Sequence, residues 1–98
     1  MLATKLQRRI LRALEAACAV KLGDDTFVEK WIVHGARGNS QDIAVTFEWS
    51  NKDGYVWEVD FSWQSLNEAQ ISGNEIRLID SDGEEAIISA FQLAAARV

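Results

Sequence analysis

The sequence predicts a single α+β domain over residues 1–98, with an N-terminal helix, an antiparallel sheet of three to four strands and a C-terminal helix. Three observations predict it. Apolar residues recur at helical spacing near the N-terminus, two central segments alternate apolar and polar residues around a turn, and a second helical stripe ends the chain. The expected order is α-β-β-β-(β)-α. Both helices should cover one face of the sheet, because only one face of the central strands is apolar.

The first helix is expected over residues 4–22, with Thr4 as its N-cap and Gly23 as its stop. Its apolar stripe consists of Leu6, Ile10, Ala13, Leu14 and Ala17. A separate basic stripe repeats at i, i+3, i+4 and i+7 and consists of Lys5, Arg8, Arg9 and Arg12.

A strand is expected at 26–34, and the segments 42–50 and 55–63 predict a β-hairpin. The sequence Asn-Lys-Asp-Gly at 51–54 suits a type I turn with glycine in the left-handed position. This turn pairs residue 51 with residue 55, and the register then places Trp49 opposite Trp57 and Ile43 opposite Trp63. The tryptophans on this face are expected in the core, beneath the helices.

The last part of the chain predicts a short fourth strand at 75–80 and a helix at 83–97. Asp82 is a suitable N-cap, and Glu85 three residues later completes a capping box. The side chains expected to face inward from this helix are Ile87, Ala90, Phe91, Ala94 and Val98.

No pattern in the sequence specifies a reaction, a cofactor or a metal. The only histidine, His34, has no serine elbow that could pair with it. Asp-Ser-Asp-Gly at 80–83 is similar to part of a calcium loop but lacks the glutamate at the twelfth position. Cys18 is the only cysteine, which excludes an internal disulfide, and we expect its thiol to be buried in the first helix. We therefore expect a non-enzymatic protein without cofactor or metal.

Charge is distributed unevenly along the chain. The net charge is −5, yet residues 1–22 hold five basic side chains against one acidic, and the remainder holds five against fourteen. Direct nucleic-acid binding by the acidic body is disfavoured, because phosphate contacts need clustered Lys and Arg. No apolar run approaches the length of a membrane span. We expect a cytoplasmic protein whose partner is a protein with a basic surface, and a homodimer is compatible with these features.

The expected partner-binding surface is the polar face of the hairpin, where the register sets Glu48 opposite Glu58 and Thr46 opposite Asp60. Size, acidity and lack of catalytic groups are shared with phage-encoded inhibitors of bacterial defence nucleases (anti-CRISPR proteins), immunity proteins and nucleic-acid mimics. The sequence thus favours an inhibitor or adaptor that docks its carboxylates on a basic groove. The alternative is a nucleic-acid-associated module that acts through the basic stripe of Lys5, Arg8, Arg9 and Arg12.

Overall fold

The computed structural model describes residues 3–35 and 39–91. These residues form an α+β fold with two helices and two antiparallel sheets. The elements in chain order are α1 (Lys5–Ala16), β1 (Ala19–Leu22), β2 (Thr26–Val28), β3 (Lys30–Val33), β4 (Ile43–Ser50), β5 (Val56–Ser62), α2 (Trp63–Asn67), β6 (Gln70–Ser72), β7 (Glu75–Ile79) and β8 (Glu85–Phe91).

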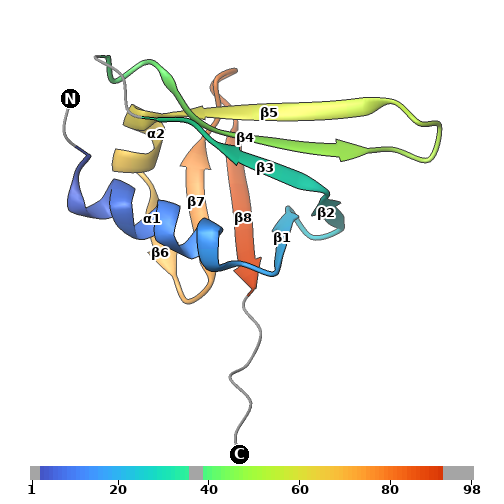
Figure 1. Cartoon of the computed structure of the whole chain (residues 1–98), viewed down its shortest axis with the longest axis horizontal. Helices are drawn as coiled ribbons and strands as arrows, with labels where there is room; N and C mark the ends of the chain where they lie inside the picture. Colours follow the sequence, from blue (N-terminus) through green and yellow to red (C-terminus); the bar gives the residue numbers. More distant parts are fainter. Residues whose placement is uncertain (1–2, 36–38, 92–98) are drawn as a thin grey trace, which may run out of the picture.

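One sheet has five strands in the order β2-β1-β8-β7-β6, and the other has three in the order β3-β4-β5. Figure 1 shows the three-stranded sheet lying across one end of the five-stranded sheet, with the strands of the two sheets running in crossing directions. The chain passes from one sheet to the other at Glu29, the single residue between β2 and β3. The edge strands of the two sheets are therefore almost one continuous strand.

The core lies between the sheets and the two helices. The three-stranded sheet contributes Phe47 and Phe61, whose rings meet edge to face with centroids 5.6 Å apart. The other buried side chains around them come from both helices and the five-stranded sheet and include Ile10, Leu14, Val20, Trp63, Leu66, Ile76, Leu78 and Ile88.

The first helix begins as predicted. Thr4 is its N-cap and forms a capping box with Gln7, in which each side chain accepts from the other residue's backbone N–H. The helix ends at Ala16 rather than residue 22, because the following residues form strand β1 between β2 and β8. Cys18 follows the helix and is exposed, so the expectation of a buried thiol was wrong.

The predicted hairpin register is confirmed along most of its length. Trp49 is opposite Trp57, Phe47 opposite Val59, and the two polar-face pairs are as expected. Near the body a bulge shifts the register, so Ile43 pairs with Ser62 and not with Trp63, which begins α2. Trp57 was expected in the core but is 54% exposed. The hairpin extends past the other described elements, so none of them covers its distal end (Figure 1).

The predicted C-terminal helix was wrong over residues 85–91, which form β8 in the middle of the five-stranded sheet. Residues 92–98, including Ala94 and Val98, lie outside the described residues. This segment suits a strand that is paired on both sides, because it contains the β-branched pair Ile87-Ile88 and its alternation buries Ile88 and Ala90. The preceding strand, β7, agrees with the prediction at 75–80.

The second helix of the fold is α2, which the sequence did not predict. It packs against α1, where the Gln7 side chain donates to the Trp63 carbonyl over 2.7 Å. The Ser62 hydroxyl accepts from the Ser65 backbone N–H and caps the helix. The two helices therefore lie together at the end of the molecule opposite the hairpin tip (Figure 1).

Candidate functional site

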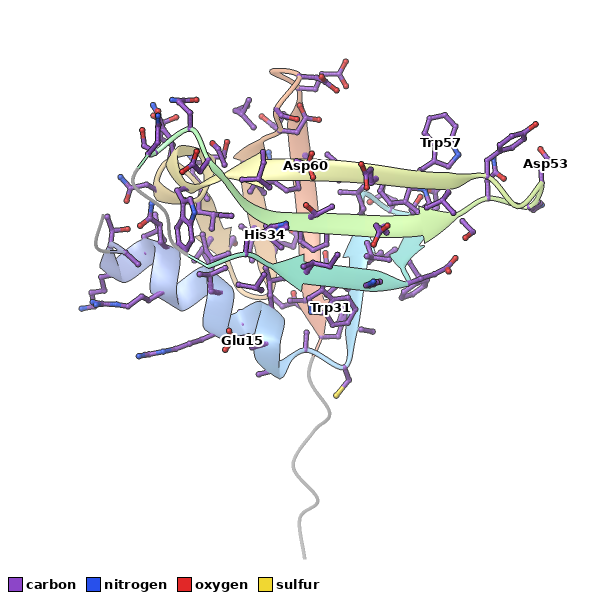
Figure 2. The ribbon with its side chains drawn as sticks, turned by 45° about the horizontal axis from the view of Figure 1, so that its top comes forward. Glu15, Trp31, His34, Asp53, Trp57 and Asp60 are labelled. Atoms are coloured by element: carbon purple, nitrogen blue, oxygen red, sulfur yellow. The ribbon has the colours of Figure 1, made fainter. Side chains whose placement is uncertain are left out.

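The four predicted partner-binding residues lie together on the outer face of the three-stranded sheet, but two of them are engaged with each other. Thr46 is buried, and its hydroxyl donates to an Asp60 carboxylate oxygen over 2.6 Å. His34 Nε2 lies 3.0 Å from the same hydroxyl oxygen. Because the hydroxyl hydrogen goes to Asp60, His34 must be the donor in the second bond. Figure 2 shows His34 and Asp60 on neighbouring parts of this face.

The outer face carries positive groups as well as carboxylates. Lys30 pairs with Glu48 across the β3–β4 ladder, with Nζ 4.0 Å from the carboxylate, and His34 lies further along the same strand edge. The Glu48 side chain is only partly exposed. An ion pair this long at the surface contributes little to stability. It does reduce the negative potential that the sequence predicted for this face.

Glu58 differs from the other three because it is exposed and also borders a groove on the other side of β5. This acidic groove, of about 530 Å³, opens between the distal half of the hairpin and two turns of the five-stranded sheet. Its apolar lining comprises Leu22, Trp49, Trp57, Val59, Ala86 and Ile87. Its carboxylates are Asp24, Glu58, Asp80, Asp82, Glu84 and Glu85, and no Lys or Arg is among the described residues that line it.

The turn that follows β7 brings most of these carboxylates to the groove. Asp80 accepts hydrogen bonds from the backbone N–H groups of Asp82 and Glu84, over 2.9 and 3.0 Å, and Gly83 takes a positive φ of 83°. The turn thus points a short acidic segment toward the space under the hairpin. The Asp-Ser-Asp-Gly sequence of this turn is typical of a tight turn, but Asp82 and Glu85 were interpreted as a helix cap.

The basic stripe of Lys5, Arg8, Arg9 and Arg12 lies exposed on α1, as predicted. Within the described part of the chain, none of these four side chains lies within ion-pair distance of a carboxylate. Next to the stripe, α1 and the β6–β7 turn border a second cavity of about 340 Å³, lined by Arg9, Ile10, Ala13, Ile71, Gly73, Asn74, Ile76, Ala90 and Phe91. The acidic groove does not share any of these lining residues.

Among residues 3–35 and 39–91, no three side chains of His, Cys, Asp or Glu are gathered in a way that could hold a metal ion. The same ranges contain no helix long and apolar enough to cross a membrane. The residues that the sequence analysis missed are Trp49 and Trp57, assigned to the core, and the carboxylates of the β7–β8 turn.

Comparison with known proteins found no family model that matches the chain, and no match among the curated proteins or the solved structures.

Proposed function

We propose that this protein is a small, non-enzymatic protein-binding inhibitor or adaptor that docks its acidic surface on a basic groove of a partner protein. The observation that carries the proposal is the acidic groove, in which six carboxylates surround exposed indole and aliphatic surface without a Lys or Arg among its described lining residues. Aromatic anchors inside a charged rim are typical of protein interfaces. The mode of action would be that of anti-CRISPR proteins or immunity proteins, which occupy a functional surface of their target.

Contacts among the expected docking residues favour one of them, Glu58, as the centre of the proposed surface. Glu58 belongs to both the outer face and the groove, whereas Glu48 is close to Lys30 and Asp60 is hydrogen-bonded to Thr46. We therefore propose that the partner binds at Glu58 and the acidic groove. Glu48, Asp60 and Thr46, on the outer face of the three-stranded sheet, would contribute less. Among the described residues, only Glu85 of the groove carboxylates has an ion-pair partner, Arg77 at 3.5 Å, so the partner's basic side chains would meet carboxylates that are mostly unpaired.

The test uses two charge-reversal variants of the full chain. Proteins that the wild type captures are purified and titrated with wild type, with Glu58→Lys/Glu84→Lys and with Glu48→Lys alone. We expect a basic partner with one-to-one stoichiometry, affinity that falls with salt, and loss of binding in the double variant, because like charges across an interface cost several kcal/mol. Glu48→Lys should have a lesser effect. A partner that binds the double variant as tightly as the wild type would refute the proposal.

A second candidate function is supported by the exposed basic stripe on α1, whose four cations have no ion-pair partner within the described residues. If it contacts nucleic acid, four phosphate contacts predict a slope of about −3.6 for log K against log salt concentration. Changing Lys5, Arg8, Arg9 and Arg12 to Gln should then abolish binding to a DNA or RNA duplex. We expect no such binding by the wild type at physiological salt, because the acidic body repels the phosphates.

A further inference from the structure

Strand β5 has one side of its backbone directed away from the sheet. Among the strands of the described residues, it is an edge strand that pairs with β4 alone. The backbone N–H of Asn51 donates to the Tyr55 carbonyl over 3.0 Å, which fixes residues 51 and 55 as a hydrogen-bonded pair. Because such pairs alternate along an antiparallel ladder, Trp57 and Val59 also bond to β4, whereas the N–H and C=O groups of Val56, Glu58 and Asp60 point outward.

Only one end of this outward edge has a partner. The Asp60 carbonyl accepts from the backbone N–H of Ser81 over 3.2 Å, which confirms its outward direction. No hydrogen bond within residues 3–35 and 39–91 covers the outward groups of Val56 and Glu58. The side chains around them are exposed, at 68% for Tyr55, 66% for Val56 and 54% for Trp57. Figure 2 shows Trp57 on this projecting part of the hairpin, near Asp53 in the turn.

Natural proteins usually protect an edge like this one. Common devices are a proline, charged side chains such as lysine, a bulge or a covering loop. Residues 55–59 contain no proline and a single charged side chain, Glu58, and the only irregularity of the β4–β5 ladder is at its other end, between Ile43 and Val45. Among the described residues, the loop contact at Asp60 covers the edge only close to the body. The distal edge therefore has unpaired backbone groups next to exposed apolar side chains.

Charge identifies the segment that this edge can accept. A second copy of the chain would add its own β5 in antiparallel orientation, and its Glu58 would then lie opposite or beside the Glu58 of the first copy. Like charges directly opposite are destabilising, and the net charge of −5 adds repulsion. A strand from another protein can place Lys or Arg opposite Glu58 on one face of the sheet. It can place aliphatic side chains next to Trp57 on the other face. Because side chains alternate along a strand, its cations would lie on the face of Glu58 and its aliphatic side chains would face the acidic groove.

We propose that the partner adds a short strand of alternating basic and aliphatic residues to the open edge of β5, bonding to the backbone of Val56 and Glu58. This proposal rests on the proposed function and specifies how the acidic surface binds. Backbone pairing provides affinity and the alternating side chains provide specificity, as in other examples of strand addition. The free stretch is short, so the added strand is about five residues long.

The test uses a synthetic peptide of alternating Lys and Val, blocked at both ends, together with the same peptide N-methylated at the backbone positions that would bond to β5. The two peptides share charge and side chains but differ in their ability to pair. We expect the unmethylated peptide to bind the full-length protein at low salt. The methylated peptide should bind about tenfold more weakly or worse, because two interstrand hydrogen bonds are lost.

A variant of the protein also tests whether binding needs backbone pairing, this time by a change in β5 instead of the peptide. Val56→Pro removes an N–H that points away from β4, so it should leave the hairpin ladder intact and weaken peptide binding about tenfold. Val56→Thr is the matched control and should bind like wild type, and thermal unfolding of both variants checks the fold. The methylated peptide keeps the proposal falsifiable even if the proline variant does not fold.

Three outcomes would overturn the proposal: no binding of the unmethylated peptide, equal binding of the two peptides, or a homodimer that Val56→Pro dissociates. Equal binding of the two peptides would leave the proposed function intact, because it would show docking by charge without strand pairing. Failure of the proposed function has a different signature, namely a partner protein that is insensitive to the Glu58→Lys/Glu84→Lys change.

Discussion

The β4–β5 and β7–β8 hairpins have turns with the same hydrogen bonds, and yet they differ in how they serve the molecule. In each turn, the side chain of the first residue, Asn51 or Asp80, accepts from the N–H groups two and four residues later. In each, a glycine at the fourth position has a positive φ, 84° at Gly54 and 83° at Gly83. The closing backbone bonds also correspond, at 3.0 and 2.9 Å.

Their surroundings explain the difference. The β7–β8 hairpin is in the five-stranded sheet, where β8 is paired on both sides and buries Ile88, so its exposed turn joins two strands of the body. The distal part of β4–β5 extends beyond the core and exposes Tyr55, Val56 and Trp57. The same local turn chemistry thus joins two strands of the body in one hairpin and two projecting strand ends in the other. Three pairs of substitutions and one single substitution test this contrast.

The largest difference is expected between a core residue of β8 and an exposed residue of β5. Ile88→Ala should lower the free energy of unfolding by about 2–5 kcal/mol, because Ile88 is only 2% exposed and its removal leaves a cavity. Trp57→Ala should cost about 1 kcal/mol or less, although the indole is larger. Urea denaturation measures both. Equal costs would mean that the distal hairpin is packed in solution.

The turn side chains should show a smaller contrast. Asp80→Ala removes two hydrogen bonds to a carboxylate and should lower the free energy of unfolding by about 2–3 kcal/mol, whereas Asn51→Ala removes two bonds to a neutral amide and should cost about 1 kcal/mol. Thermal unfolding of the two variants provides the comparison. A greater loss for Asn51→Ala would show that the hairpin tip contributes more to the fold than its exposure indicates.

The glycines should show equal strain with different consequences. Alanine at either positive-φ position costs about 1–2 kcal/mol locally. For Gly83→Ala this cost should appear in global stability. For Gly54→Ala it should appear mainly as faster amide hydrogen exchange near the hairpin tip. Global destabilisation by both variants to the same extent would argue against independent opening of the tip.

The smallest effect is expected from Asp80→Asn, which makes the second turn chemically like the first. The amide oxygen can accept the same two N–H groups, and only the added strength of a charged acceptor is lost, so stability should fall by about 1 kcal/mol. The change also removes one carboxylate from the acidic groove. A large loss of stability would show that the charge of Asp80, and not only its hydrogen bonding, holds the turn.

The same comparison shows how far the sequence can predict this fold. The Asn-Lys-Asp-Gly turn was identified because long alternating segments flank it, and the resulting register is correct from Trp49–Trp57 to Val45–Phe61. Asp-Ser-Asp-Gly at 80–83 has an equivalent pattern, but an Ala- and Ile-rich segment follows it that suits either a helix or a buried strand. Pairing with β1 and β7 decides for the strand, and such long-range pairing is not visible in local periodicity.

The acidic surface was predicted only in part, for a related reason. Alternation correctly placed Glu48, Glu58, Thr46 and Asp60 on one face. It could not show that Lys30 lies beside Glu48 or that His34 donates to Thr46, because these contacts depend on the neighbouring strand. It also assigned Trp57 to the core, since periodicity identifies a face and not how far the covering layer extends.

The unequal burial of the four tryptophans gives the protein an intrinsic fluorescence reporter for its own groove. Trp63 is buried and Trp31 is partly buried with its indole N–H bonded to the Leu14 carbonyl, whereas Trp57 is more than half exposed beside six carboxylates. Iodide, an anion, should quench Trp57 emission poorly, while caesium, a cation, should be concentrated there and quench it well. The ratio of the two quenching constants would measure the electrostatic potential at this surface before any partner is known.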